Sequence, residues 1–331
     1  MKLLGFSCGR KVGNTEILIK EALMGAEELG VEVEILRMLD LDIRPCKFCK
    51  NCLARQDGPE ACVIKDDAAF LYNTFMDCDG IILGAPVYAL TPPGYLKMME
   101  DRVLGPNVDL ASMRARKKSG GINPFTGGKV FVDDRAFKPR VGALISDGGA
   151  SSPHWLSFGL ALLYTFTFPP NVVVIDHLQV FKAQPAPHVG MVVLNDKALA
   201  RARKLGCNVA AAMGKPINKV KWMGDSPGIC PVCHCNLLTV TNKNPVECPV
   251  CGISGTLKIE NGKISVAFSE KEQEHSRLTE TGKLDHQIEI QNVMKEQAPR
   301  AAEVPLKVKK YKSYLTPLKP PSKLKKSAVK D

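Results

Sequence analysis

The sequence predicts an α/β protein with a doubly wound, five-stranded parallel sheet, followed by a small β module that binds a metal. Two observations lead to this fold class. Strand-like and helix-like segments alternate over residues 1–215, the pattern of a parallel sheet covered by helices on both faces. Two pairs of cysteines then follow within a chain of 331 residues, which has room for one large domain and one small one.

The five strands are expected in short runs rich in apolar and β-branched residues: Lys2–Phe6, Val31–Leu36, Gly80–Gly84, Arg140–Ile145 and Val172–Val180. Helices are expected between and after them: Thr15–Leu29, Asp66–Met76, Pro93–Val103, Pro153–Thr165 and Asn195–Met213. A long segment between Leu104 and Pro139 is expected to be an exposed insertion. Ligands of such sheets bind at the carboxyl ends of the strands, near the topological switch point, so the loops after strands one, three and four are the expected ligand-binding loops.

Each of these three loops has residues suited to a ligand. Strand one runs into Ser7-Cys8-Gly9-Arg10-Lys11-Val12-Gly13-Asn14-Thr15, and a helix follows at once. Backbone N–H groups, hydroxyls and an arginine in such a loop can hold a phosphate at the helix N-terminus, although an ordinary helix cap is the alternative. Strand three ends in Pro86-Val87-Tyr88, and strand four ends in Ser146-Asp147-Gly148-Gly149.

Four cysteines within seventeen residues mark the loop that precedes the second helix: Cys46, Cys49, Cys52 and Cys62. The C-x2-C-x2-C spacing matches the three-ligand run of bacterial-type iron–sulfur sites. The fourth cysteine comes ten positions after the third, and no proline follows it, so the run differs from the cysteine motif of bacterial ferredoxins. We predict a [4Fe–4S] cluster here, and the alternative is a cysteine-bearing loop that assembles none.

The second set, Cys230, Cys233, Cys248 and Cys251, consists of two C-x2-C pairs separated by fourteen residues. This spacing is typical of a tetrathiolate metal site. Zinc would make residues 230–268 a structural ribbon, whereas mononuclear iron would make them rubredoxin-like, and we favour zinc. Asn261-Gly262 predicts a β-hairpin within the ribbon. Residues 216–229 are expected to be a linker, and residues 269–331 a helical segment and a basic, extended tail.

In their order along the chain, the motifs resemble those of the NADPH-dependent FMN reductase family, over about residues 1–213. The resemblance rests on the loop after strand one, on Pro86-Val87-Tyr88 with Leu96-Lys97 and Asp101-Arg102, and on the glycine loop after strand four. It implies a flavodoxin-like fold. The cysteine run before Val63-Ile64-Lys65-Asp66-Asp67 is similar to that of the iron–sulfur flavoproteins of anaerobes.

The resemblance also implies roles for individual residues. Arg10, Asn14 and Thr15 would hold the FMN phosphate, with Ser7 and Cys8 in the same loop. Pro86, Val87 and Tyr88 would line the isoalloxazine, and Ser146, Asp147, Gly148 and Gly149 would close its other edge. The chain departs from the family pattern because Ser7-Cys8 replaces Gly-Ser and Gly9 replaces a proline, and a thiol is a poorer donor than a hydroxyl.

Charge and composition limit the partners and the location. Residues 300–331 hold ten Lys or Arg and two Asp or Glu, a net charge of +8 of the +11 of the whole chain. This Pro- and Lys-rich tail is expected to be extended or disordered, as a solvated extension or, alternatively, as an arm that contacts an acidic partner or a neighbouring subunit. Nucleic-acid binding is not expected, because no recognition fold accompanies the tail. Clustered cysteines without a secretory signal predict a cytoplasmic protein, and no membrane span is expected.

Together these features predict an FMN-dependent oxidoreductase. It would pass electrons between a reduced donor, NAD(P)H or a ferredoxin-type carrier, and an acceptor, through FMN and the cluster. We assign no catalytic residue, because flavin chemistry belongs to the cofactor. The alternatives are an NAD(P)H-dependent flavin- or quinone-type reductase without a cluster, and a non-catalytic binding protein stabilised by its metal. The resemblance and the charge-free run Leu156–Phe168 also predict a homodimer or tetramer.

Overall fold

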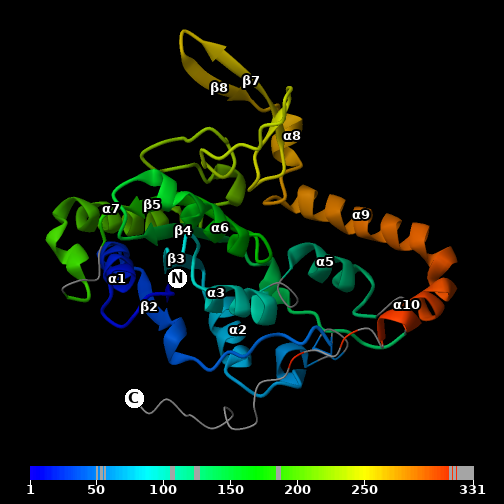
Figure 1. Ribbon diagram of the computed structural model, residues 1–331. Helices are drawn as coiled ribbons and strands as arrows, with labels where there is room; N and C mark the ends of the chain where they lie inside the picture. The colour runs from blue at the N-terminus through cyan, green and yellow to red at the C-terminus, as the bar shows by residue number, and fades with distance from the viewer. Residues whose placement is uncertain are drawn as a thin grey trace. The chain divides into compact units, whose positions relative to one another are not determined.

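The computed structural model describes residues 1–49, 51–52, 55, 57–104, 109–122, 127–183, 188–312, 315 and 318. These residues divide into two compact units, Met1–Asp285 and His286–Asp331. Both sheets lie in the first unit (Figure 1). No helix in the described ranges has an apolar stretch long enough to cross a bilayer.

The larger sheet has five parallel strands in the order β2-β1-β3-β4-β5, as predicted for a flavodoxin-like, doubly wound fold. Its strands are β1 Lys2–Ser7, β2 Glu32–Arg37, β3 Gly80–Pro86, β4 Arg140–Asp147 and β5 Val172–Val180. Ser7 pairs with Gly84, and Pro86 pairs with Asp147. The loops after β1, β3 and β4 therefore share one edge of the sheet.

Helices cover both faces of this sheet. One face carries α1, Asn14–Glu27, and α7, Asp196–Ala212, and the other carries α2, Ala68–Asp77, α3, Gly94–Met99, and α6, Ser157–Thr167 (Figure 1). Helices α1 and α7 approach so closely that a Cβ atom on Gly206 would lie 1.7 Å from the carbonyl oxygen of Ala22. Only glycine fits at that contact.

Three predicted segments differ in detail. Residues Pro153–Trp155 form a 3-10 turn, so helix α6 starts later than predicted, at Ser157. Helix α3 passes into a π-helix over Glu100–Leu104. The predicted insertion contains an additional helix, α5, Leu110–Lys118, and its buried Leu110, Ala111 and Met113 show that this part of the insertion packs into the protein. These three apolar residues lie among polar neighbours, so the sequence shows no clear amphipathic pattern that would predict this helix.

The smaller sheet is antiparallel and consists of β6 Val246–Glu247, β7 Ser254–Glu260 and β8 Lys263–Ala267. The predicted hairpin is confirmed: Asn261 and Gly262 join β7 to β8 with φ angles of 51° and 74°. These left-handed angles favour asparagine and glycine. Helices α8, Glu270–Glu274, and α9, Glu280–Gln297, follow.

Helix α6 is buried on two sides. The four cysteines of the second set belong to the same buried cluster as Leu160, Leu163 and Tyr164 of α6, and the last two are fully buried. The charge-free run that predicted a subunit contact is therefore covered in part by the ribbon of the same chain. The homo-oligomer itself stays a prediction.

The segment predicted to be a linker also makes specific contacts. The Met223 N–H donates to the carbonyl of Ile175 in β5 (2.7 Å), and Asn208 of α7 donates to the carbonyl of Met223 (3.1 Å). Arg201 of α7 pairs with Asp225. The predicted domain boundaries stay a prediction, but this segment is tied to β5 and α7 at Met223 and Asp225.

In the second unit, the prediction of an extended tail is wrong for residues 304–312. A 3-10 segment, Ala298–Glu303, leads into helix α10, Val304–Lys312. Glu303 accepts from Arg300 (2.8 Å) and from Lys307 (2.5 Å), and ion pairs at these spacings stabilise helices of basic residues. Residues 313–331, apart from Leu315 and Leu318, lie outside the described residues, so the rest of the predicted tail is untested.

Candidate functional site

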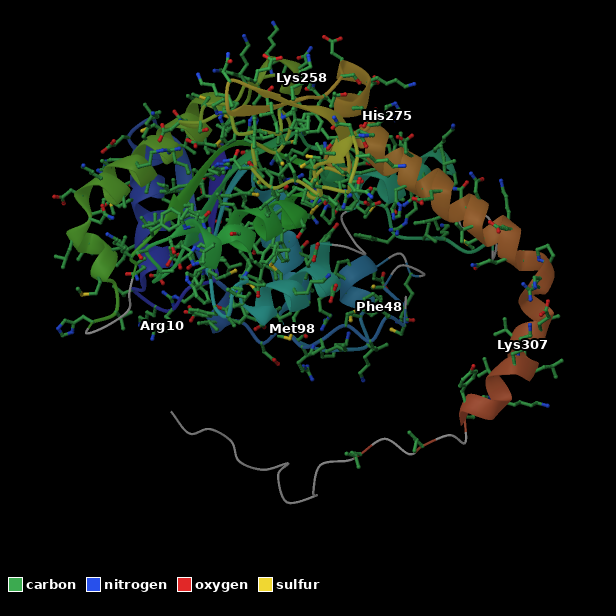
Figure 2. All side chains as sticks on the ribbon, turned by 45° about the horizontal axis from the view of Figure 1, so that its top comes forward. Arg10, Phe48, Met98, Lys258, His275 and Lys307 are labelled. Atoms are coloured by element: carbon green, nitrogen blue, oxygen red, sulfur yellow. The ribbon has the colours of Figure 1, made fainter. Side chains whose placement is uncertain are left out.

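The loop after β1 and the start of α1 form an anion-binding geometry. Helix α1 begins after Gly13, and no side chain caps it. The N–H groups of its first turn therefore face the loop, where they can donate to a phosphate. Arg10 is exposed in the same loop (Figure 2), and the Gly13 N–H donates to the Arg10 carbonyl (2.9 Å), which closes the turn.

An acidic residue in this first turn does not oppose an anion. Glu16 is buried, but its carboxylate turns toward Arg37 (2.6 Å) and Lys20 (2.7 Å). Burial alone would raise the pKa of Glu16, and the hydrogen bonds from Arg37 and Lys20 overcome this and lower it to about 2. The carboxylate is thus neutralised by two cations.

Asn14 and Thr15 are both buried and tie the loop to the rest of the sheet edge. Asn14 Nδ2 donates to the carbonyl of Ala183 (2.7 Å), and Asn14 Oδ1 accepts from the Val192 N–H (3.0 Å). Thr15 Oγ1 donates to Asp147 Oδ1 at the end of β4 (2.5 Å). Besides any contact with phosphate, these two side chains therefore hold three loops together.

Ser7 and Cys8 lie beneath the loop and are fully buried. Ser7 Oγ accepts from the Gly9 N–H (3.3 Å), and the Cys8 carbonyl accepts from the Tyr95 hydroxyl of α3. Burial raises the pKa of the Cys8 thiol far above its usual range, so this thiol stays neutral. The structure thus places both side chains where they support the loop from below.

The other two loops border the same edge. Pro86 is buried, the Val87 N–H donates to the Asp147 carbonyl (2.8 Å), and Tyr88 is 46% exposed. Ser146 Oγ is buried and has no hydrogen-bond partner among the described residues. Next to it, the Gly148 N–H donates to the Val180 carbonyl (3.1 Å), and Gly149 is half-buried. An uncapped helix start, an arginine, an unpartnered buried hydroxyl and an exposed tyrosine at one edge fit a ligand with a phosphate and a flat ring.

The first cysteine set surrounds one small cavity. Cys46, Cys49, Cys52 and Cys62 all line it, with Arg102 beside them, and its volume is about 30 Å³. Burial and the neighbouring thiols of Cys62, Cys46 and Cys49 raise the pKa of Cys52. The sulfurs do not form a tight group like that of the second set, which is the only one found among the described residues.

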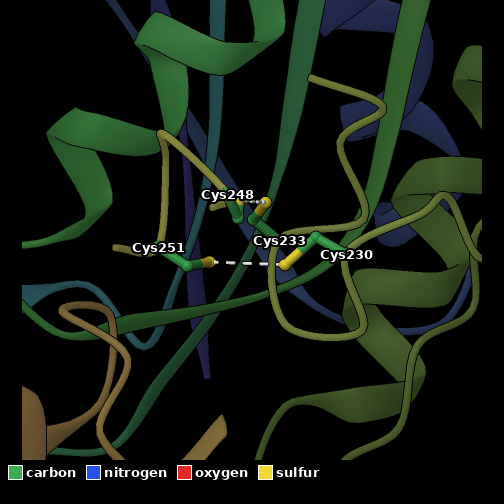
Figure 3. Close-up of side chains that lie close together, drawn as sticks. All are labelled: Cys230, Cys233, Cys248 and Cys251. Carbon is green, nitrogen blue, oxygen red and sulfur yellow. Dashed lines mark hydrogen bonds between the residues drawn. The ribbon is translucent and has the colours of Figure 1, made fainter. Parts of the chain in front are cut away.

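The second set converges on one point. All four thiols are buried and their sulfurs lie within 4.8 Å of one another (Figure 3). Cys230 and Cys251 Sγ are 3.7 Å apart, and Cys233 and Cys248 Sγ are 3.6 Å apart. A tetrahedral ion with metal–sulfur bonds of about 2.3 Å needs sulfurs about 3.8 Å apart. These residues therefore fit a mononuclear tetrathiolate metal site, as predicted.

A row of rings connects this site to the large sheet. His234, between two cysteines and with φ of 57°, stacks on Trp222 at 3.8 Å between ring centroids. Trp222 meets the edge of His177 of β5 (4.9 Å), and His177 Nδ1 is 3.0 Å from the Tyr164 hydroxyl of α6. Burial lowers the pKa of His177 to about 4, so its ring is neutral at physiological pH. The ribbon is thus fixed to α6 and β5 by aromatic packing.

Comparison with known proteins agrees with this geometry. Residues 1–181 match the sequence profile of the NADPH-dependent FMN reductases. The chain belongs to the NADPH-dependent FMN reductase family. As a member of this family, the protein is an FMN-dependent oxidoreductase.

Two relatives of the chain are similar over nearly its whole length. A flavone synthase of Aspergillus candidus is 30% identical over 297 residues, which is 86% of this chain and 87% of that protein. The solved structure of a flavone reductase superposes with a TM-score of 0.77 at 28% identity, and the match covers 97% of this chain and 100% of that one. The similarity therefore extends past the flavin domain into the ribbon.

Iron–sulfur flavoproteins are also similar to this chain, but over a shorter part of it. One from Methanosarcina thermophila is 33% identical over 151 residues, and one from Methanocaldococcus jannaschii is 39% identical over 103. These matches span 64% and 51% of the two proteins and 45% and 31% of this chain.

Sequence reasoning missed several residues of this site. Tyr95 was not among the predicted site residues and Arg102 was noted only as part of a motif, yet Tyr95 supports the loop after β1 and Arg102 lines the cysteine cavity. Trp222 lay in the predicted linker. The sequence did hold a signal for Arg102: it lies among the apolar residues Met99 and Val103 of a predicted helix, where a buried cation needs a partner. The individual FMN contacts of the predicted residues stay predictions.

Asp147 leads to a pH-dependent prediction. Burial raises the pKa of this carboxyl from 3.8 to about 6, and the bond from Thr15 opposes the shift. Between these two values the folded chain binds more protons than the unfolded chain, so stability falls as pH rises through this window and is constant above it. The shift corresponds to roughly 3 kcal/mol at neutral pH. Asp147→Asn should raise the free energy of unfolding of FMN-free protein by up to this amount at pH 7.

Urea denaturation at two pH values checks this. The Asp147→Asn variant should gain little over the natural protein near about pH 3, where Asp147 is largely protonated in both states, and the full increment at neutral pH. If Asp147→Asn raises the free energy of unfolding equally at both pH values, the burial of a charge is not the cause of the gain.

Proposed function

We propose that the protein is an FMN-dependent oxidoreductase that passes electrons from NAD(P)H to a flavone-type conjugated ketone, and that its first cysteine set binds a [4Fe–4S] cluster. The observation that carries the flavin part is the convergence of the loops after β1, β3 and β4 on one sheet edge, with the uncapped start of α1 between them. The substrate class is supported by the similarity to a flavone synthase and a flavone reductase over nearly the full length.

FMN, when bound, supplies a carrier that accepts two electrons and releases them singly or together. The chain's own groups have other tasks. The N–H groups of Asn14, Thr15 and Glu16 and the Arg10 guanidinium would hold the phosphate. Tyr88 and Ser146 to Gly149 would border the ring. In the net reaction, two electrons and a proton leave the nicotinamide, a second proton comes from solvent, and the conjugated carbon–carbon double bond becomes a single bond.

Exposed aromatic side chains follow β3 and β4 and suit a flat substrate. Tyr88 is 46% exposed, Trp155 is 55% exposed and Phe158 is 51% exposed. The rings of Trp155 and His154 lie 5.5 Å apart. Aromatic substrates gain binding energy by stacking on such rings. We propose that these residues receive the substrate.

The cluster is supported by the cavity that the four cysteines share and by the partial match to iron–sulfur flavoproteins. A cluster carries one electron at a time, so it would allow a one-electron carrier to exchange electrons with the flavin. The residues for it would be Cys46, Cys49, Cys52 and Cys62. For the second set we propose zinc, because a buried tetrathiolate at the centre of a small ribbon is a common structural zinc site.

The substrate proposal is tested by NADPH oxidation under anaerobic conditions with a flavone as the acceptor. We expect FMN to copurify and NADPH oxidation to depend on the flavone, with the saturated product detected by mass. If NADPH is oxidised with free FMN or a quinone as the acceptor but not with the flavone, the protein is a general flavin or quinone reductase instead. A protein that binds no FMN would favour the non-catalytic alternative.

The cluster proposal is tested by metal and sulfide analysis of anaerobically purified protein. A [4Fe–4S] cluster requires about four iron and four sulfide per chain, in addition to one metal ion at the second set. Full FMN content with no sulfide, even after anaerobic reconstitution with iron and sulfide, would remove the cluster and leave the flavin enzyme.

A further inference from the structure

The π-helix after α3 places one arginine at the cysteine cavity. Arg102 lies in the π-helix Glu100–Leu104, between Met99 and Val103, which are both buried in the core. Its side chain is only 2% exposed, and it lines the cavity together with the four cysteines. Short π-helical turns are rare and occur frequently at functional sites, where they redirect a side chain.

The guanidinium of Arg102 contacts both ends of the cysteine loop. Nη1 donates to the carbonyl of Arg44 (2.7 Å), two residues before Cys46. Nη1 and Nη2 each donate to one oxygen of Asp66, both at 2.7 Å, four residues after Cys62. Nη2 also lies 3.5 Å from the sulfur of Cys62. One side chain thus joins the chain before the first cysteine to the chain after the last.

Asp66 completes this connection from the other side. Its side chain is 1% exposed, and its carboxylate accepts from the N–H groups of Arg44 (2.9 Å) and Ala68 (3.2 Å). Nearby, Asp42 and Asp67 exchange two hydrogen bonds, N–H of Asp42 to the Asp67 carboxylate (2.8 Å) and N–H of Asp67 to the Asp42 carbonyl (3.0 Å). The two ends of the cysteine loop are therefore held side by side by the buried Arg102–Asp66 pair and by the exposed hydrogen bonds between Asp42 and Asp67.

We propose that Arg102 is the positioning residue of the cluster site: it fixes both ends of the cysteine loop and faces the sulfur of Cys62, and so sets the occupancy and the reduction potential of the cluster. This inference rests on the proposed cluster. The role needs arginine, because a planar fork with several donors can reach a carboxylate, a carbonyl and a sulfur at once, whereas a lysine offers a single point charge.

The chemistry explains the effect on potential. A cluster bound by four thiolates becomes more negative when it is reduced. Hydrogen bonds to ligand sulfurs and a nearby buried cation favour the reduced form, which raises the potential. In the absence of Arg102, the sulfur of Cys62 would lose its N–H contact and the Asp66 carboxylate would remain buried without its cation. Both changes favour the oxidised cluster.

The test uses full-length protein purified anaerobically, with Arg102→Met, Arg102→Lys and the control Arg201→Met. Arg201 also forms an ion pair with a fully buried carboxylate, that of Asp176, but on β5 and α7, away from the cysteine loop. The measurements are iron and sulfide per chain, the midpoint potential of the cluster from a redox titration followed by EPR, and FMN content.

We expect Arg102→Met to bind less iron and to shift the balance between oxidised and reduced cluster by about tenfold toward the oxidised form, about 59 mV for one electron. Arg102→Lys, which keeps the charge, should show a smaller shift in potential but a similar loss of occupancy. FMN content should stay equal in all variants, and Arg201→Met should bind iron with the natural potential.

The outcomes separate this inference from the proposed function. If the natural protein binds no cluster after anaerobic reconstitution, the cluster proposal fails and this inference fails with it. If the natural protein binds a cluster and Arg102→Lys, with normal FMN content, keeps the natural occupancy and potential, only the role of Arg102 is refuted. The lysine variant decides the matter even if Arg102→Met does not fold.

Discussion

Replacing Cys230 and Cys248 with serine is expected to release the metal and unfold the ribbon, residues 230–268. The ribbon has few large apolar residues, and several of them, such as Val240, Ile259 and Ile264, are more than half exposed. Ordering each residue costs about 1–2 kcal/mol in backbone entropy. Four thiolates on one ion contribute on the order of 10 kcal/mol, so their loss exceeds what the remaining packing supplies.

The same substitution should leave FMN bound. The loop after β1 is held by the contacts of Asn14 with Ala183 and Val192 and by that of Thr15 with Asp147. None of these groups contacts the ribbon cysteines, which pack on α6. The expected result is therefore a chain with normal FMN content, no metal at the second set, and new protease sensitivity after about residue 216.

Cys235→Ser is the matched control, since this buried cysteine lies in the same knuckle but outside the tetrad. It should keep the metal and the protease resistance. Loss of FMN together with the metal would show that the ribbon is part of the flavin site and that residues 1–215 are no separate domain. Iron at the site that cycles with the flavin would make the ribbon an electron relay in place of a zinc module.

Asn14→Ala has the second largest expected effect. It leaves the buried carbonyl of Ala183 and the N–H of Val192 without their partner. An unsatisfied buried polar group costs about 1–3 kcal/mol, so roughly 2–6 kcal/mol of stability should be lost. FMN affinity should fall as well, because the first turn of α1 then loses its attachment to the two segments that flank it.

Asn195→Ala is the control of the same residue type. Asn195 caps α7 by accepting from the Ala198 N–H (3.1 Å), and losing a cap costs about 1 kcal/mol. It should leave FMN affinity unchanged. Denaturation of the FMN-free variants and fluorescence titration with FMN measure both effects. If Asn14→Ala and Asn195→Ala behave alike in both measurements, the bridging role of Asn14 is wrong.

Local signals in the sequence were sufficient for the strands of the large sheet, for most of its helices and for the recognition of both cysteine sets. Short apolar runs, most of them with β-branched residues, marked all five strands of the large sheet, and Asn261-Gly262 marked the hairpin because those two residues tolerate left-handed backbone angles. The spacing of the second cysteine set predicted a tetrathiolate site because two short knuckles can bring four sulfurs to one point, as they do here. These properties depend on neighbours a few positions apart.

The tail shows where the local reading failed. Its lysines and prolines indicated an extended chain, yet residues 304–312 are helical, with Glu303 accepting from Arg300 and Lys307. Composition described the average of the segment, whereas the helix depends on ion pairs at particular spacings.

Only the tertiary structure decided which distant groups meet. The sequence itself determined the parallel sheet, the loops at its carboxyl edge and two cysteine sites. It could not show that Asn14 bridges residues 183 and 192, that Arg102 reaches Arg44, Cys62 and Asp66, or that the ribbon covers α6. The physical reason is that periodicity reports which face of an element is buried but not what buries it. The partner is chosen by packing and hydrogen bonding between segments that are up to 182 residues apart, and no local pattern records that choice.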